Sequence, residues 1–423
     1  MSAVVERFGK AVGRLAQDRP NRALRLLRAG YAASGLQVRF FPDRRLLPHQ
    51  RYAAAVSNRA IRAPLSKPED SAVVSAFTPC ELLHAMRIAP QFPEGLACYL
   101  NGADAERVFI RRAEDEGIPK TYCSYHKALL GAALSGVLPK PRLVVNTTLA
   151  CDANSNTFRT LADDIWRVPR FTVDVPGGGS GAVPYVAGQL RELAAFLEEH
   201  LGRALSQDAL RDVIRRENRC AELYRESFRE LAEKSVPNDM TSEMYKIFLT
   251  HVLLGTPEAE RYFELLLDDV RKAPPAGGEL RLLWAHTLPF WQDSMKRMLN
   301  GNPKVRLLCC DLNFDFLEQP REEEPYETLA RKLLSHTMGG ANSRRSRRLL
   351  ETARALRADG LVYFCHWGCE HTLGGAYLTR RALEAAGIPT LILDGDGCDR
   401  ANVNDGQMRT RLQAFLEMLE AEK

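Results

Sequence analysis

Strand-like apolar runs alternate with helical patterns in two separate stretches of this chain, and this alternation constrains the fold more than any other feature. In the first stretch, "DSAVVSAF" and "PRLVVNTTLACD" flank several helical patterns. In the second, the strand-like runs are "LRLLWAH", "KVRLLCCDL", "GLVYFC" and "IPTLILDGDG". Strands that alternate with helices form parallel sheets that the helices cover. The chain is therefore predicted to be an α/β protein with two Rossmann-like parallel-sheet domains.

The segments around these stretches predict four parts. Residues 1–70 are expected to form a helical N-terminal arm and linker, and residues 71–184 the first α/β domain. That domain ends in the glycine-rich run "VPGGGSGAVP", which lacks the Lys-Ser/Thr of a P-loop and is interpreted as a linker. Residues 185–275 are dense in helix formers and predict a helical middle segment. Residues 276–423 are expected to form the second α/β domain.

The charge and hydropathy patterns exclude some classes of partner. The formal net charge is only +5, and no dense basic tract carries interleaved aromatic residues, so nucleic acid is not an expected partner. No apolar run is long enough to span a membrane. The first thirty residues lack the apolar core of a signal peptide. We therefore expect a cytoplasmic protein with no membrane partner.

The chain has ten cysteines, which need an explanation in a reducing compartment where disulfides are rare. A free cysteine often packs as a small buried hydrophobe. This interpretation suits Cys220, which lies in a charged helical stretch, and Cys309 and Cys310, which end a strand-like run.

Other cysteines fall at positions where ligands bind in α/β proteins. In open parallel sheets, ligands bind beyond the carboxyl ends of the strands. Cys151 and Cys365 each end a strand-like run, and Cys369 follows in the loop before the next helix. Cys80 and Cys123 are predicted near the starts of helices, where the helix dipole favours the thiolate that binds metals.

The spacing of these cysteines bears on the kind of centre they could form. A structural zinc site usually carries tight CxxC pairs, and a ferredoxin-type cluster has its own compact run, but neither is present. Thiols gathered from distant loops fit an iron–sulfur centre at a domain interface, with one iron open if only three thiolates bind. A zinc site and simple core packing remain alternatives.

Several motifs together resemble one family. They are "TPCELLHAM", "YCSYHKALLGAALSG", "HWGCEHTLGGAYL" and "GIPTLILDGDGCDR". They resemble the 2-hydroxyacyl-CoA dehydratase D-component family, which includes benzoyl-CoA reductase subunits and double-cubane-cluster reductases. The resemblance implies a [4Fe-4S] cluster held by three cysteines, and a homodimer or a heterodimer with a related subunit. It also implies electron delivery from a separate ATP-hydrolysing iron–sulfur activator, since this chain has no Walker motif.

The resemblance can be carried onto individual residues. The implied metal ligands are Cys80, Cys123 and Cys369. The further cysteines that could bind the cofactor are Cys98, Cys151 and Cys365. All six together would be enough for the alternative, an [8Fe-9S] double-cubane cluster.

The implied activity is that of a lyase, a radical-type 2-hydroxyacyl-CoA dehydratase, or of a low-potential reductase of acyl-CoA or another small molecule. A substrate oxygen would bind the open iron, which polarises it as a Lewis acid. His366, Glu370 and His371 lie beside Cys369 and could move protons, although loop solvation or helix capping also explains them. A cluster-binding subunit without turnover and a zinc or cluster-free structural protein are the competing hypotheses.

Overall fold

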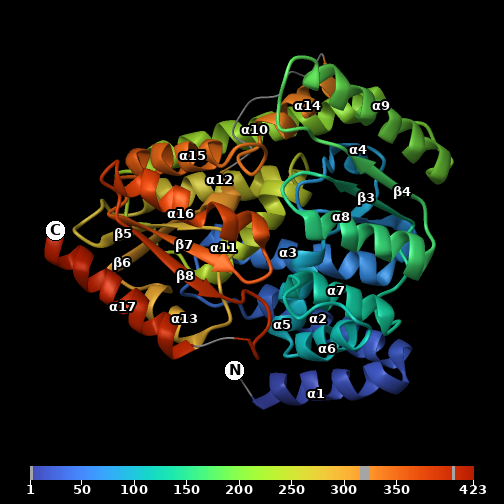
Figure 1. Cartoon of the computed structure of the whole chain (residues 1–423), viewed down its shortest axis with the longest axis horizontal. Coiled ribbons are helices and arrows are strands. Elements are labelled where there is room, and N and C mark those ends of the chain that lie inside the picture. The colour runs from blue at the N-terminus through green and yellow to red at the C-terminus, as the bar shows by residue number, and fades with distance from the viewer. Residues whose placement is uncertain (1–2, 315–323, 403–404) are drawn as a thin grey trace.

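The computed structural model describes residues 3–314, 324–402 and 405–423, and its framework is a pair of four-stranded parallel sheets (Figure 1). The first sheet has the order β2-β1-β3-β4, with the strands β1 (Ser71–Val74), β2 (Ala89–Gln91), β3 (Leu143–Thr147) and β4 (Arg170–Val173). The second has the order β6-β5-β7-β8, with β5 (Leu280–Ala285), β6 (Val305–Cys310), β7 (Gly360–His366) and β8 (Thr390–Gly395). The predicted α/β class with two parallel sheets is confirmed.

The two sheets share one strand plan, because in each the second strand along the chain lies outside the first, and the third and fourth follow on the other side. The order therefore reverses between β1 and β3 and again between β5 and β7, and such switch points are where doubly wound sheets bind ligands. The central strands β1, β3, β5 and β7 are buried along their whole length, as expected for parallel strands covered on both faces.

Two edge strands have no counterpart in the sequence prediction. β2 spans three residues and contains Pro90, which cannot donate a ladder hydrogen bond and is tolerated only at an edge. β4 is mostly half-buried and begins with Arg170. Neither has the long apolar run by which a buried strand is recognised.

The N-terminal part of the chain is helical. Its helices are α1 (Ala3–Asp18), α2 (Pro20–Phe40) and α3 (Pro48–Ser66), followed by the short turn η1 (Pro68–Asp70). α1 packs on α2, α2 on α3, and α3 on β1 and β2. The side chains of Val12, Leu27 and Ile61 are buried in the common core, so these helices are part of the body of the protein.

The helices around the first sheet are α4 (Glu81–Ala85), α5 (Pro93–Gly102), α6 (Glu106–Asp115), α7 (Ser124–Leu134) and α8 (Asp152–Arg159), which continues as η2 (Thr160–Trp166). α5 and α6 both pack on α7, and α8 packs on β3. η2 is a π-helical turn, an uncommon conformation that often occurs near functional sites.

The middle of the chain forms α9 (Ala182–Leu201), α10 (Gln207–Leu231), α11 (Met240–Ile247) with its π-helical continuation η3 (Phe248–Val252), and α12 (Pro257–Lys272). Three of these helices begin at hydrogen-bonded capping residues, since Ser206, Asp239 and Thr256 accept from the backbone N–H three residues later. α10 packs along α12, and α12 packs on α3.

The helices of the last part are α13 (Asp293–Leu299), α14 (Pro325–Ser335), α15 (Asn342–Ala355), α16 (Glu370–Glu384) and α17 (Asp405–Glu422), with the short turn η4 (Asp311–Asn313) after β6. Figure 1 shows α15 and α16 on one side of the second sheet and α13 and α17 on the other. α14 crosses to the other half of the molecule and packs on α9.

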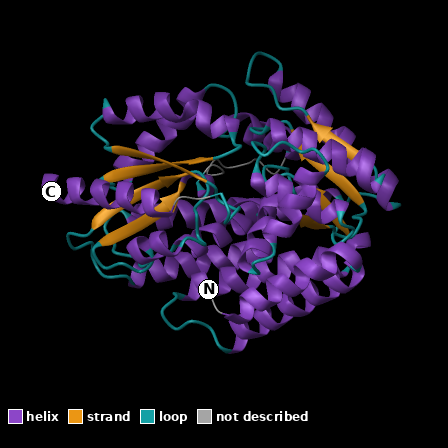
Figure 2. Ribbon diagram, turned by 60° about the horizontal axis from the view of Figure 1, so that its bottom comes forward, coloured by secondary structure: helices purple, strands orange, loops and turns teal. Residues whose placement is uncertain are grey.

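The halves meet over a continuous apolar core, and Figure 2 shows the sheets side by side with loops between them. Asp396, after β8, accepts a hydrogen bond of 2.5 Å from Ser124 in α7, and Asn101 in α5 donates to the Cys398 carbonyl at 2.6 Å. Within the described ranges, no helix combines the length and apolar character needed to cross a bilayer.

Candidate functional site

A cavity of about 560 Å³ lies where the carboxyl ends of strands from both sheets meet. Phe77 follows β1, Cys151 follows β3, His286 follows β5 and Cys369 follows β7, and all four line it. Helices α1, α2, α5 and α11 supply a large part of the remaining wall. The volume is in the range of pockets that enclose a small molecule, and the position is the one expected for a ligand in this fold class.

Three cysteines on this wall each occupy the residue immediately before a helix. Cys123 precedes α7, Cys151 precedes α8 and Cys369 precedes α16. The Cys151 sulfur accepts a hydrogen bond of 3.3 Å from the backbone N–H of Asn154. Cys151 and Cys369 stand at equivalent places in the two halves, each after the third strand of its sheet. The N-terminal ends of three helices thus surround the space where the sulfurs lie, which favours negative charge there.

His366 holds the sulfur of Cys123. Its Nε2 lies 3.3 Å from Cys123 Sγ, and its Nδ1 accepts a hydrogen bond of 3.0 Å from the backbone N–H of Gly397. Since Nδ1 is an acceptor, the ring proton is assigned to Nε2, which donates to the sulfur. Burial lowers the pKa of His366, in agreement with a neutral ring. Both nitrogens are therefore occupied in orienting Cys123.

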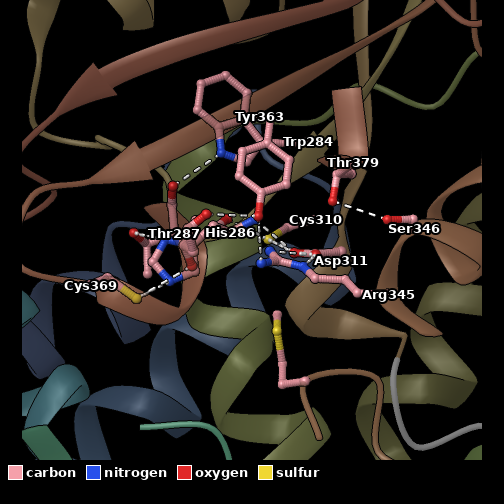
Figure 3. Close-up of polar contacts among 12 residues, drawn as sticks. Trp284, His286, Thr287, Cys310, Asp311, Arg345, Ser346, Tyr363, Cys369 and Thr379 are labelled. Carbon is pink, nitrogen blue, oxygen red and sulfur yellow. Dashed lines mark hydrogen bonds and ion pairs between the residues drawn. The ribbon is translucent and has the colours of Figure 1, made fainter. Parts of the chain in front are cut away.

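The sulfur of Cys369 is held by a second set of contacts, and Figure 3 shows the contact with His286. His286 Nε2 lies 3.6 Å away, and the Cys369 thiol donates to the hydroxyl oxygen of Thr372 at 3.3 Å. His286 has a left-handed backbone with φ of 75°, a conformation that non-glycine residues rarely adopt. Its N–H donates to Asp311 at 2.6 Å and its carbonyl accepts from the Cys310 thiol at 2.9 Å, which keeps it in place.

Beneath these residues lies a buried ion pair between Arg345 and Asp311 (Figure 3). The guanidinium of Arg345 approaches Asp311 Oδ2 at 2.7 Å and donates to the Tyr363 hydroxyl at 3.0 Å. That hydroxyl donates in turn to the carbonyl of Thr372 at 3.1 Å. The network therefore links β7, α15 and the first turn of α16, on which Cys369 and Thr372 depend for their position.

Gly368 allows the loop after β7 to approach the loop before α7. Its φ is 82°, and a Cβ built on it would lie 2.6 Å from the backbone nitrogen of Cys123. Only glycine fits both the backbone conformation and the contact. This close approach places Cys369 in the second half of the molecule next to Cys123 in the first.

The ionisation of these thiols differs from the expectation that helix ends favour thiolate. Burial raises the pKa of Cys123 well above its usual value, and the neighbouring Cys151 and Cys369 raise it further. Burial, with Cys369 nearby, raises the pKa of Cys151 to about 12. Desolvation and mutual repulsion therefore outweigh the helix dipoles at Cys123 and Cys151, and these two thiols alone are neutral at pH 7. Thiolate would form only when a positive group takes the place of the protons.

The donor set fits a polynuclear metal group better than a single ion. Among the described residues, no group of three or more His, Cys, Asp or Glu side chains is arranged to hold one metal ion. The three thiols instead come from separate helix starts around one cavity. In a cluster each iron takes its own cysteine, so the sulfurs do not need to converge on one point.

The structure does not bring all the predicted cysteines together. Cys98, in α5, lines the cavity with Cys123, Cys151 and Cys369. Cys80 is buried beside Glu81 and near Lys332, and does not line the cavity. Cys365 is also absent from the wall, because side chains alternate along β7 and the adjacent His366 faces the cavity.

The three cysteines that were interpreted as core residues do lie in the core. Cys220, Cys309 and Cys310 are free and fully buried. Cys310 has an additional role, since its thiol holds the His286 carbonyl.

The residues predicted to move protons do not all line the cavity. His371 lines the cavity, and burial lowers its pKa, with Arg345 lowering it further. Glu370 is exposed and does not line the cavity. His371 is thus able to act as a neutral base toward a bound molecule, whereas Glu370 faces away from it.

Glu94, His126 and His286 also line the cavity, although no site role was predicted for them from sequence. Burial raises the pKa of Glu94 to about 7, and its Oε1 lies 3.9 Å from His126 Nε2. Within the described part of the chain, Glu94 Oε2 has no hydrogen-bond partner. The positions of two of these residues could have indicated a site. His286 directly follows strand β5, and Glu94 stands in the first turn of α5.

Comparison with known proteins identifies the family. The family model described as 2-hydroxyglutaryl-CoA dehydratase, D-component, matches residues 75–419. The chain belongs to this family. The resemblance seen in the motifs is confirmed, and the match starts directly after β1 and covers the other strands of both sheets and the helical segment between them.

The curated relatives of the chain are dehydratase subunits. The alpha subunit of lactoyl-CoA dehydratase from Anaerotignum propionicum is 22% identical, over 82% of this chain and 90% of the relative. The alpha subunit of (R)-phenyllactyl-CoA dehydratase from Clostridium sporogenes is 20% identical, over 82% and 88%. Subunit alpha of (R)-2-hydroxyglutaryl-CoA dehydratase from Acidaminococcus fermentans is 25% identical, over 67% and 61%. The prediction of an enzyme of the dehydratase family is confirmed, and the names of these relatives imply partner subunits.

Proposed function

We propose that this chain is the iron–sulfur subunit of a 2-hydroxyacyl-CoA dehydratase and binds a [4Fe-4S] cluster through Cys123, Cys151 and Cys369. One observation carries the proposal: the two halves of the fold direct three thiols, each at a helix N-terminus, into one cavity. Cys151 replaces Cys80 in the ligand set expected from sequence, because Cys80 does not reach this cavity.

The arrangement supports one cluster over two. A double-cubane cluster with six protein ligands was expected to draw on Cys80, Cys98, Cys123, Cys151, Cys365 and Cys369. Of these, Cys80 and Cys365 do not line the cavity, which leaves four thiols. Cys98 is then an additional cavity residue beside three cluster ligands.

The proposed reaction removes water from a 2-hydroxyacyl-CoA. The bond between C2 and the hydroxyl oxygen breaks, a proton leaves C3, and the products are a 2-enoyl-CoA and water. When bound, the cluster would supply a Lewis-acidic iron with an open position and a low-potential electron, which is returned at the end of the cycle. The polypeptide must then bind the thioester, exclude solvent and move two protons.

Side chains on the cavity wall suit these proton transfers. The carboxyl of Glu94, with its pKa near 7, is largely protonated in slightly acidic solution and can donate to the leaving hydroxyl. The imidazole of His371 is neutral and can accept a proton from carbon. His366 and His286 orient the sulfurs of Cys123 and Cys369 and are positioning residues.

The proposal includes two protein partners. A separate ATP-hydrolysing iron–sulfur activator would deliver the electron, and a related subunit would pair with this chain, in line with the alpha-subunit names of the relatives.

The experiment is an anaerobic turnover assay with the chain, its partner subunit, an activator, ATP and a reductant. We expect conversion of a 2-hydroxyacyl-CoA to the 2-enoyl-CoA, loss of turnover in Cys369→Ser, and retained turnover in Cys80→Ser. Formation of a saturated acyl-CoA from an enoyl-CoA in place of dehydration would favour a reductase. Full turnover by Cys369→Ser would refute the proposed ligand set.

A further inference from the structure

One part of the cavity wall is mostly apolar and comes from four helices. α1 supplies Val5 and Phe8, and α2 supplies Tyr31. α5 adds Tyr99, and α11 with its continuation adds Met244, Tyr245, Ile247 and Phe248. Cys123, Cys151 and Cys369 come from the strand ends and the helix starts next to them, so the cavity has a sulfur-bearing side and a mostly apolar side, on which Cys98 and His251 also lie.

The aromatic rings of this wall are packed against one another. The rings of Phe92 and Phe248 are 4.8 Å apart in an edge-to-face arrangement, and Tyr99 contacts Phe248 at 6.4 Å and Tyr31 at 5.4 Å. Gly95 leaves room for this packing, since a Cβ on it would lie 2.5 Å from Phe92 and 2.7 Å from Phe248. The wall is therefore a fixed aromatic surface suited to an apolar group.

The charges around the cavity also favour an uncharged ligand group. Among its described lining residues there is no lysine and no arginine, and the single carboxylic acid is Glu94. An anionic group on the wall would thus meet no lysine or arginine there, and an ionised Glu94 would repel it.

Two buried cations on neighbouring elements are already paired. Arg345 is bound to Asp311 and Tyr363. Lys246, in α11, lies 3.5 Å from Glu243 and 4.7 Å from the centre of the Tyr224 ring, and does not line the cavity. A negatively charged ligand group could recruit either only by breaking a buried interaction, which is costly.

We infer that the acyl group accepted by this site is uncharged and apolar, with an aliphatic or aromatic side chain, and that a second carboxylate is rejected. The inference rests on the proposed function, because it assigns the acyl class of the same thioester. The sulfur-bearing side would receive the reacting carbons, and the aromatic wall would receive the end of the acyl chain.

The test compares the binding of two thioesters with side chains of equal size. One is 2-hydroxy-5-methylhexanoyl-CoA and the other is 2-hydroxyglutaryl-CoA, in which a carboxylate replaces the terminal isopropyl group. Their dissociation constants are measured by calorimetry on the protein as purified anaerobically, without activator, so that no turnover occurs. We expect the apolar thioester to bind about a hundredfold more tightly, since a carboxylate buried without a partner loses its hydration uncompensated.

A pair of variants makes the comparison specific to the wall. Thr241→Arg places a guanidinium on the half-buried start of α11, which lines the cavity. This variant is expected to reduce the ratio of the two dissociation constants at least tenfold, because the guanidinium gives the carboxylate of 2-hydroxyglutaryl-CoA a partner. Thr410→Arg introduces the same charge on the exposed face of α17 and is expected to leave the preference unchanged.

The outcomes separate the inference from the proposed function. Equal binding of the two thioesters, or tighter binding of the dicarboxylate, would overturn the inference and leave the dehydratase proposal standing. If neither thioester bound, the proposed function would fail and the inference with it.

Discussion

Removal of the Lys332 ammonium should destabilise the protein strongly without affecting the cavity. Lys332, in α14, lies 2.6 Å from Glu81 in α4 and 2.7 Å from Glu217 in α10. Glu81 and Glu217 are 2% and 0% exposed. The lysine therefore compensates two buried carboxyl groups that join three helices from different parts of the chain.

The size of the expected loss of stability follows from the carboxylate charge that remains when the lysine is removed. Lys332 lowers the pKa of Glu81 against its burial, whereas burial raises the pKa of Glu217, so the three groups hold one ionised carboxylate against one ammonium. Lys332→Met leaves that carboxylate buried and unpaired, which costs about 3–5 kcal/mol of unfolding free energy. Urea unfolding monitored by circular dichroism measures this difference. Lys272→Met is the matched control, because Lys272 pairs with Asp268 on the surface, and it should change little.

The loss of stability in Lys332→Met should depend on pH. Without the lysine, the folded-state pKa values of both carboxyl groups lie above their unfolded values, so the folded variant binds more protons and loses stability as the pH rises. The deficit of Lys332→Met should therefore be larger at pH 8 than at pH 5. The reasoning is refuted if Lys332→Met and Lys272→Met unfold at the same urea concentration, or if the deficit grows as the pH falls.

Three further predictions concern the site itself. Gly368→Ala should lower the unfolding free energy by about 1–3 kcal/mol, because of its positive φ and its contact with Cys123. Gly374→Ala in the same segment, where a Cβ meets no atom, should be neutral or stabilising, and equal thermal shifts for the two would contradict this reading. Glu94→Gln should remove a loss of stability that the wild-type protein shows between pH 5 and 8.5, about 3 kcal/mol from a pKa raised from 4.5 to about 7. Parallel urea curves for wild type and variant at both pH values would count against it. Arg345→Met should lower the unfolding free energy by about 3–5 kcal/mol, because it leaves the buried Asp311 unpaired. Arg380→Met, which removes an exposed pair with Glu384, should change it little, and equal unfolding midpoints of the two variants in denaturant would contradict this prediction.

The sequence predicted the fold class because buried parallel strands leave a strong signal. β3, β5 and β7 are apolar runs buried on both faces and were recognised as strands. β2, with a proline in three residues, and the half-buried β4 lack that signal, since edge strands need no continuous apolar run.

The site was predictable where it follows from topology. Residues after a strand or before a helix meet at one edge of a parallel sheet, so Cys123, Cys151 and Cys369 could be placed near a site from their spacing. The side of the strand that each cysteine faces could not be placed to the residue, and Cys365 lies one residue from the cavity-facing His366. Glu94 and the aromatic wall are brought to the cavity by the packing of helices from distant parts of the chain, for which a single sequence carries no local pattern.

The most direct test of the cluster proposal is the iron and acid-labile sulfide content of anaerobically purified protein, measured for the wild type and for single cysteine variants. We predict about four irons and four sulfides per wild-type chain, the content of one [4Fe-4S] cluster. Cys123→Ser, Cys151→Ser and Cys369→Ser should each lose most of this iron, while Cys80→Ser and Cys365→Ser keep it. A wild-type chain without iron, or iron that survives in Cys369→Ser and disappears in Cys80→Ser, would contradict the proposed centre.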